Sequence, residues 1–465
     1  MVNKRIRRTI TAALMAGVMS TAAFVPTVAA AAKNDANLTG NGKDVKNVIL
    51  MISDGWGYNQ ILATDYYTEG KTGTQVYENF PTQVAMSTYS FGDLTTADNA
   101  DGVYDPATVW ENFNTLMNNP TDSAAAGTAM STGVKTYDAA IGVDEQPEDL
   151  THMTQDFETQ GKATGVVSSV EFSHATPASF VAHHEIRNDY SILANEMIKD
   201  SATDVIMGAG NPLYTDNGET AAVANYKYVG GADTWNGLVD GTLDVSDADG
   251  DGIDDAWTLI QSKEDFEALQ TGETANRVIG VPEVYTTLQQ ARGGDAQADA
   301  FAVEQNSNVP GLDVMTTGAL NVLDNDEDGF FLMVEGGAID WAGHANQSGR
   351  LIEEQAAFND SVEAVYDWVE ENSNWGETLL IVTGDHETGY LTGTEGVYDE
   401  VVNNGTGVMP TMAWNSGNHT NQLIPFFAKG AGAEIFKKVA DETDPVRGAY
   451  LDNTEISEVI RTLID

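Results

Sequence analysis

Cysteine is absent from the 465-residue chain, so no disulfide bond stabilises the protein. Hydrophobic residues make up 42% of the sequence, which is enough for a large buried core and excludes a disordered or fibrous protein. We therefore expect the stability of the fold to come from that core and from bound ions.

Basic residues are scarce. The chain has 22 Lys and Arg residues against 71 Asp and Glu residues, and its formal net charge is −49. So acidic a surface repels nucleic acid and anionic membranes, which excludes nucleic acid as a binding partner. The acidic residues are spread along the chain, and this favours a halophilic surface over an acidic interaction tail. An anionic substrate would need a local reversal of the field, which metal ions together with an arginine provide.

Long apolar runs are missing after the first 32 residues. Residues 1–32 combine a basic start, an apolar run over 10–25 and small residues at 30–32, the pattern of a cleaved secretory signal. A retained amphipathic anchor is the alternative. Cleavage would remove four basic residues and lower the net charge from −49 to −53. It would leave a periplasmic or secreted protein without membrane attachment, beginning with a polar linker over 33–46.

Three apolar runs end in acidic residues. Residues 47–53, 330–334 and 378–384 have the length and composition of strands buried on both faces, as parallel strands are. Asp54, Glu335, and Asp385 with His386 follow them. Ligands bind at the carboxyl edge of open α/β sheets, so we expect these side chains to meet. The sequence predicts an α/β fold with a large, mostly parallel central sheet and helices on both faces; separate solvated acidic turns are the alternative.

A second ligand pattern follows the run over 330–334. Asp340 and His344 stand four residues apart, so a helical turn places both side chains on one face. Zinc accepts imidazole nitrogen and carboxylate oxygen, and Glu335 nearby suits a harder ion. The pair predicts half of a metal site, with a solvated acidic turn and a chance histidine as the alternative.

Small residues dominate the stretch over 120–136, which reads PTDSAAAGTAMSTGVKT. The composition predicts a helix that packs closely on a sheet, with Thr121 or Asp122 as its N-cap. Ser123 then lies in the first turn, where free N–H groups and the helix dipole favour an anion and a developing alkoxide. The position suits a nucleophile, and a helper of the cap is the alternative.

Further candidates flank two other predicted strands. His174 and Thr176 follow a strand over 163–170, and Arg187 is expected on the next helical segment. The planar guanidinium of Arg187 suits two phosphate oxygens, and an ordinary surface arginine is the alternative. His419 lies among small residues ahead of a strand over 423–428.

Two segments are typical of loops. Residues 201–320 contain DADGDGIDD, in which Asp247, Asp249, Asp251 and Asp255 resemble a calcium loop of the EF-hand or thrombospondin kind. Thr258 stands where the bidentate acid belongs, so a halophilic acidic loop is the alternative. Residues 389–418, rich in Gly, Thr and Asn, are typical of a functional insertion.

Taken in chain order, TDSAAAGTA, EGGAIDWAGH, TGDHE and SGNHT resemble the nucleophile and zinc motifs of the alkaline phosphatase family. The resemblance implies one catalytic domain over 47–465, with insertions near 201–320 and 389–418. It implies Ser123 as nucleophile, Arg187 on the phosphate, two Zn²⁺ and one Mg²⁺. The implied ligands are Asp340, His344 and His419 for one zinc, Asp54, Asp385 and His386 for the other, and Asp54, Thr176 and Glu335 for magnesium.

The chain departs from the best-known bacterial member at His174 and Trp341, where that enzyme has Asp and Lys. Marine bacterial members resemble this sequence at both positions. His174 puts the magnesium site in question because imidazole favours zinc, and we expect His174 and Asp122 behind the ligands and Trp341 beside the phosphate. His152, His183 and His184 match no metal motif.

The resemblance implies an exported phosphomonoesterase that releases alcohol and phosphate through a phosphoserine, and commonly a homodimer. A sulfatase or phosphodiesterase on the same scaffold is one alternative, because function resides in the site. An exported calcium-dependent binding protein is another. It leaves the clusters at the strand ends unexplained.

Overall fold

The computed structural model describes residues 45–92, 104–247 and 255–464. The predicted signal segment over 1–32, most of the linker over 33–46, and Asp249 and Asp251 lie outside the described residues. The calcium loop therefore stays a prediction.

An 11-stranded sheet forms the centre of the fold. In spatial order the strands are β14 (Glu442–Asp444), β15 (Gly448–Asp452), β2 (Thr82–Ser87), β13 (Ile424–Gly430), β8 (Thr378–Thr383), β1 (Asn47–Ser53), β7 (Phe330–Gly336), β3 (Ala163–Glu171), β4 (Val205–Ala209), β6 (Val278–Gly280) and β5 (Thr258–Ile260). Pairing is parallel from β8 through to β5 and between β15 and β2, whereas β13 runs antiparallel to both neighbours and β14 to β15. The predicted mostly parallel sheet is confirmed.

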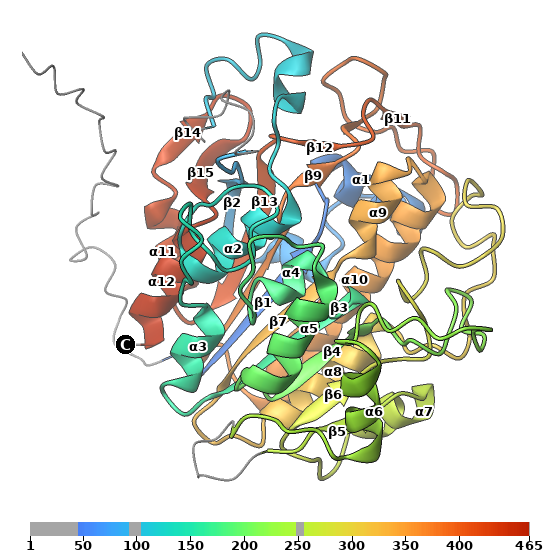
Figure 1. The fold of residues 1–465 in the computed structure, drawn as a ribbon. Coiled ribbons are helices and arrows are strands. Elements are labelled where there is room, and N and C mark those ends of the chain that lie inside the picture. The colour runs from blue at the N-terminus through green and yellow to red at the C-terminus, as the bar shows by residue number, and fades with distance from the viewer. Residues whose placement is uncertain (1–44, 93–103, 248–254, 465) are drawn as a thin grey trace, which may run out of the picture. The chain divides into compact units, whose positions relative to one another are not determined.

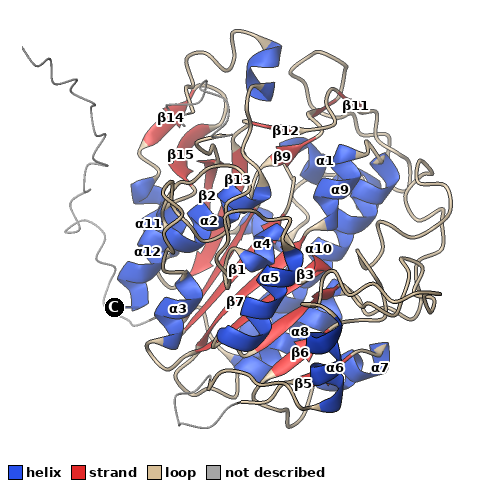
Figure 2. Ribbon diagram, in the orientation of Figure 1, coloured by secondary structure: helices blue, strands red, loops and turns tan. Residues whose placement is uncertain are grey.

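Helices cover both faces of the sheet, as Figures 1 and 2 show. On one face lie α2 (Ser123–Thr132), α3 (Met153–Glu158), α4 (Ala175–Ala178), α5 (Tyr190–Asn195), α6 (Ala232–Asp240), α11 (Ala433–Val439) and α12 (Glu455–Ile464). On the other lie α1 (Tyr58–Thr68), α7 (Lys263–Leu269), α8 (Leu312–Leu323), α9 (Ala338–His344) and α10 (Ser348–Asn372). Two hydrophobic cores result, one on each side.

The unbroken apolar runs of the central strands have a direct structural cause. Successive side chains of a strand point to opposite faces. In β1, Val48, Leu50 and Ile52 enter the first core, and Ile49 and Met51 enter the second. Both faces are covered, so no position in the strand is left for a polar side chain until the strand ends.

The segments expected as insertions are built differently from each other. Residues 201–320 supply β4, β5 and β6, which extend one edge of the central sheet. Residues 389–418 contain only the short strands β10 (Leu391–Thr392) and β11 (Ala413–Trp414), which pair with each other; β9 (Glu387–Thr388) pairs with β12 (His419–Thr420) beside them. The limits of the catalytic domain and of its insertions stay predictions. In the described part of the chain, no helix has both the length and the apolar character needed to cross a membrane.

Candidate active site and metal centre

The neighbouring strands β8, β1 and β7 lie in the middle of the sheet, and their carboxyl ends lie side by side. Ser53 pairs with Gly336 and Ile52 with Thr383, so Asp54, Glu335 and Asp385 arrive at one edge, as the sequence predicts. The Asp385 Oδ1 atom accepts a hydrogen bond from the Gly55 amide at 3.1 Å. Gly55 has φ +79°, and a Cβ there would lie 2.7 Å from the Asp340 Cα. Only glycine allows this turn to press so closely on α9.

A second set of ligands comes from α9 and β12. The Nε2 atoms of His344 and His419 lie 3.0 Å apart, and each is 3.4 Å from an Asp340 carboxylate oxygen. The opposite ring nitrogens are anchored: His344 Nδ1 is 2.7 Å from the Gly417 carbonyl, and His419 Nδ1 is 2.7 Å from the Thr121 carbonyl. Anchoring of this kind fixes the tautomer and aims Nε2 at the centre, as in metal-ligating histidines.

Among the described residues, potential ligand atoms form three groups, and within each group the atoms lie within 4.8 Å of one another. They are Asp340, His386 and His419; Asp54, Asp385 and His386; and Asp54, His174 and Glu335. His386 and Asp54 each belong to two groups, so the groups form one continuous centre. The His386 and His419 rings stack with their centroids 3.6 Å apart.

The donor atoms fit divalent cations. Both carboxylate oxygens of Asp54, Oε1 of Glu335, Oδ2 of Asp385 and Oγ1 of Thr176 are buried without a hydrogen-bond partner among the described residues. Burying an unpaired carboxylate is costly unless a cation or a proton compensates it. Mixed carboxylate and imidazole donors suit zinc, and carboxylate with hydroxyl oxygen suits magnesium.

The pKa values show the same crowding of negative charge. Burial and the neighbouring Asp385 raise the pKa of Asp54 well above its ordinary value. Burial, with the charge of Asp385, raises the pKa of Glu335 to about 7, and burial with the charge of Asp340 raises that of Asp385 to about 6. Asp340 differs: against the effect of burial, the hydrogen bond and charge of His419 hold its pKa well below the usual range. Bound cations would keep the first three ionised.

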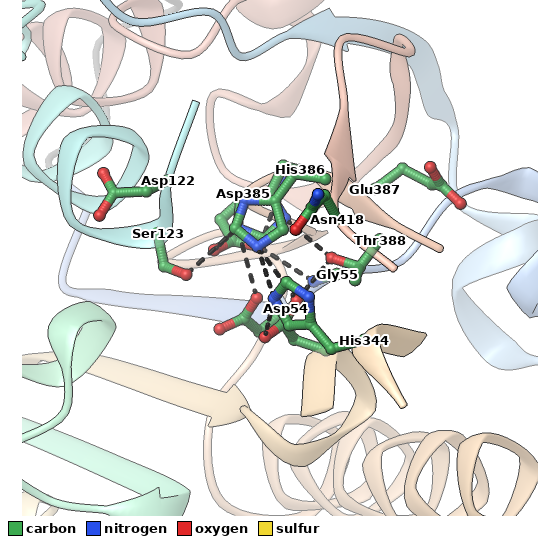
Figure 3. Close-up of polar contacts among 12 residues, drawn as sticks. Asp54, Gly55, Asp122, Ser123, His344, Asp385, His386, Glu387, Thr388 and Asn418 are labelled. Atoms are coloured by element: carbon green, nitrogen blue, oxygen red, sulfur yellow. Dashed lines mark hydrogen bonds and ion pairs between the residues drawn. The ribbon is translucent and has the colours of Figure 1, made fainter. Parts of the chain in front are cut away.

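Ser123 is the first residue of α2 and faces this centre. Asp122 is the N-cap, and its Oδ1 accepts a hydrogen bond from the Ala125 amide at 3.0 Å, which confirms the predicted cap. The Ser123 Oγ atom lies 3.1 Å from His386 Nε2. Figure 3 shows Ser123 pointing toward His386, while the Asp122 carboxylate points away from the cluster. The cap thus orients the helix, and the next residue presents its hydroxyl to the ligand groups.

Arg187 completes the site from a different element than the sequence suggested. The expectation that it lies on a helix is wrong: Arg187 occupies a turn, and α5 begins only at Tyr190. Its guanidinium is 2.9 Å from Asp122 Oδ2 and 3.3 Å from His174 Nε2. It lines a cavity of about 490 Å³ together with Ser123, His174, Asn188, Tyr190, Gln290, Asp340, Trp341, His344 and His419.

His174 lies nearer the centre than its sequence suggested. We expected it behind the ligands, yet one of its ring nitrogens belongs to the group with Asp54 and Glu335, and Nδ1 has no hydrogen-bond partner in the described chain. Burial and the charge of Arg187 lower the pKa of His174 to about 3, so the ring is neutral and has a lone pair to donate. The Trp341 ring packs edge-on against it at 5.8 Å.

The sequence missed several residues of the site. Thr388 Oγ1 donates to Asp340 and lies 3.3 Å from His386 Nδ1, so it links two ligands. Asn188, Tyr190 and Gln290 line the cavity, and no motif marks them. Glu387, although next to His386, points away and accepts hydrogen bonds from Gln60, Thr420 and Gln422, so it fixes the loop instead (Figure 3).

Comparison of the chain with known protein families identifies the family to which it belongs. A family model described as alkaline phosphatase matches residues 45–413. The chain belongs to the alkaline phosphatase family. The resemblance found in its motifs is confirmed, and so is the expectation of an enzyme: alkaline phosphatases are phosphoric monoester hydrolases.

The similarity to individual alkaline phosphatases is modest in identity and broad in coverage. Alkaline phosphatase 3 of Bacillus subtilis strain 168 is 27% identical over 479 residues, which cover 88% of this chain and 89% of that protein. Alkaline phosphatase of Escherichia coli K12 is 28% identical over 435 residues, covering 86% and 84%. The solved structure of alkaline phosphatase from the Antarctic bacterium TAB5 is 28% identical, with a TM-score of 0.60 and coverage of 91% and 99%.

Proposed function

We propose that this alkaline phosphatase is an exported, metal-dependent phosphomonoesterase that works through a phosphoserine on Ser123. The observation that carries the proposal is the position of Ser123 Oγ. It lies at a helix N-terminus, 3.1 Å from a histidine that belongs to two ligand groups, in a cavity that also contains Arg187. A nucleophile, ligand groups suited to cations and an anion-binding arginine converge there.

We assign one Zn²⁺ to Asp340, His344 and His419 and a second to Asp54, Asp385 and His386. We assign one Mg²⁺ to the third group, which consists of Asp54, Glu335 and the nearby Thr176, with His174 beside them. A variant of the TAB5 enzyme in which a histidine is replaced by aspartate has Mg bound in its M3 site. His174 adds a nitrogen donor to our third group, which makes zinc a competitor for that position. Elemental analysis of protein purified without added metal would give the number of each ion per chain.

The chain's own residues account for substrate positioning and for the nucleophile. Arg187 holds two phosphate oxygens with its planar fork, and the free N–H groups at the start of α2 face the same anion. Ser123 Oγ forms a bond to phosphorus as the bond to the alcohol oxygen breaks, and water then attacks the phosphoserine and releases phosphate. When bound, the divalent ions neutralise charge on the attacking and departing oxygens.

The proposal predicts a preference among three matched substrates. An aryl phosphate should be hydrolysed at least about a hundredfold faster, as kcat/KM, than the corresponding diester or aryl sulfate. Arg187 and the ligand groups are arranged for a dianionic group with three free oxygens, whereas a diester and a sulfate carry one charge. Side-by-side assays would decide, and a faster diester or sulfate reaction would favour the phosphodiesterase or sulfatase alternative.

Replacement of Arg187 by alanine should weaken phosphate binding more than metal binding. We expect the phosphate concentration needed for half-maximal inhibition to rise roughly tenfold or more, because a charge-assisted bidentate contact is lost. The metal content per chain should stay unchanged. Lys199→Ala removes a cation at the end of the α5 region, on the same face but outside the cavity lining, and serves as the matched control. Unchanged inhibition in Arg187→Ala would remove the residue from the phosphate site.

We further propose export to the periplasm or medium, a halophilic surface and a homodimer. The signal pattern over 1–32 supports export, and the net charge of −49 supports a high-salt habitat. The segment over 389–418 exposes the apolar side chains of Val397, Val402 and Val408, which supports its use as an interface.

A further inference from the structure

A second cavity, of about 480 Å³, shares none of its lining residues with the catalytic cavity. Its walls come from the first half of α10, the start of α8 and the segment over 301–311. Its volume is within the range of small-molecule sites, roughly 300–1,000 Å³. None of its lining residues belongs to the three ligand groups of the catalytic centre.

Glu354 is the decisive residue of this cavity. It lines the cavity, it is only 5% exposed, and its Oε1 atom is buried without a hydrogen-bond partner among the described residues. Arg292, whose positive charge also acts on Glu354, forms its ion pair with the neighbouring Glu353, whose Oε2 lies 2.7 Å from Arg292 and 3.3 Å from Arg350. Glu354 therefore presents at the cavity a buried carboxyl oxygen that has no hydrogen-bond partner in the described part of the chain.

The rest of the lining separates into an acidic rim and an apolar wall. Asp313 and Asp360 add negative charge, and Lys263, the only basic residue among the described lining residues, donates to the Ser307 carbonyl. The apolar wall is formed by Leu288, Phe301, Val309, Pro310, Leu312, Ala356 and Ala357.

Phe301 shows that this wall is held in place. Its φ is +60°, a strained conformation for a bulky residue, and its amide donates to Glu353 Oε1 at 2.7 Å. The side chain nevertheless remains 50% exposed while lining the cavity. The hydrogen bond to Glu353 thus fixes the backbone of Phe301, and its large apolar side chain forms part of the cavity wall.

We propose that this cavity binds a small organic ammonium compound, with its cationic nitrogen on Glu354 and its hydrocarbon body against the apolar wall. A bare divalent ion fits less well, because among the described residues no third carboxylate or imidazole comes close enough to Glu354 to complete a ligand group. A neutral apolar ligand would leave the Glu354 carboxylate unpaired.

Calorimetric titration of the metal-loaded enzyme with hexylammonium chloride tests the proposal. Burial and the charge of Glu353 raise the pKa of Glu354 to about 8, so the titration is run at roughly pH 9, where both partners are charged. Saturating inorganic phosphate keeps the catalytic cavity filled. We expect saturable binding of hexylammonium, at least about tenfold weaker binding of hexan-1-ol, and a similar loss in Glu354→Gln.

Control variants distinguish the site from general attraction of cations to an acidic protein. Glu371→Gln removes the same charge from an exposed position on the same helix and should bind hexylammonium like the wild type. Ala357→Phe fills the cavity without changing charge and should weaken binding, so the proposal does not depend on a single variant. Circular dichroism confirms that each variant is folded.

The proposal would be overturned by a lack of saturable binding to the wild type, by equal binding to Glu354→Gln and wild type, or by the absence of any effect of Ala357→Phe. Binding of Ca²⁺ that depends on Glu354, without binding of hexylammonium, would also overturn it and assign the cavity to a metal.

Discussion

Alanine in place of Ser123 should lower the turnover of an aryl phosphate by roughly four orders of magnitude or more, as loss of a catalytic nucleophile does in other hydrolases. The hydroxyl is the only group removed, and the ligand groups and Arg187 remain. Metal content and inhibition by phosphate should therefore stay near their wild-type values. Steady-state kinetics measures the turnover, and mass spectrometry of acid-quenched enzyme should find a phosphorylated peptide in the wild type and none in the variant.

Ser131→Ala provides the matched control. The substitution is the same and lies on the same helix, but the Ser131 hydroxyl donates to the Ser179 carbonyl and not to the catalytic centre. Activity should be retained, with a loss of stability on the order of 1 kcal/mol from the missing hydrogen bond. Near-normal turnover by Ser123→Ala would show that another group attacks phosphorus.

Replacement of Asp54 by asparagine should lower turnover nearly as much as Ser123→Ala does, but for a different reason. Asp54 belongs to two ligand groups, so its loss removes one charged ligand from each. We expect at least about a thousandfold loss of turnover, because correct placement of a bound ion governs the reaction, together with a measurable loss of metal per chain. Elemental analysis and kinetics at saturating added zinc and magnesium would measure the two effects.

In the absence of metal, Asp54→Asn should be more stable than the wild type at alkaline pH. The pKa of Asp54 is raised in the folded protein, so its ionisation destabilises the fold, and this destabilisation grows as the pH rises from the unfolded pKa toward the folded one. The asparagine side chain of Asp54→Asn carries no such charge, so the chelator-treated variant should melt above the chelator-treated wild type at alkaline pH. Lower melting of the variant in both states would contradict this account.

Glu387→Gln is the control for a buried carboxylate beside the centre. Its carboxylate accepts hydrogen bonds from Gln60, Thr420 and Gln422 and binds none of the ligand groups. Metal content should be kept while thermal stability falls. Metal loss of the same size as in Asp54→Asn would mean that any perturbation here empties the centre, and the special role of Asp54 would be withdrawn.

The central strands and their acidic ends were predictable from the sequence because parallel strands covered on both faces allow few polar residues. The runs that contain Ile49, Leu332 and Ile381 are unbroken for that reason, and the change to Asp54 or Asp385 marks the sheet edge. Pairing of β1 with β7 and β8 then brings residues hundreds of positions apart together, which the strand-end rule anticipates.

Other parts of the site depend on contacts that no local pattern encodes. Arg187 was expected on a helix, but the chain reaches helical geometry only at Tyr190, and the intervening turn directs the guanidinium toward Asp122. Thr388 is an ordinary threonine in the sequence and becomes a link between Asp340 and His386 only because β9 folds beside α9. His174 likewise becomes a member of a ligand group through the packing of α4 against β7.

The ligands differ in how firmly the fold anchors them. Asp54 and Asp385 follow strands in the middle of the sheet, the part of a domain that usually opens last. His419, in contrast, belongs to a two-residue strand, and the His344 side chain is 39% exposed. With the cations we propose in place, local opening of the surface loops would release the cation held by His344 and His419 before those held by Asp54 and Asp385. Dilution or ageing of the enzyme would deplete its metals in a fixed sequence, outermost first, and inactivation would precede unfolding.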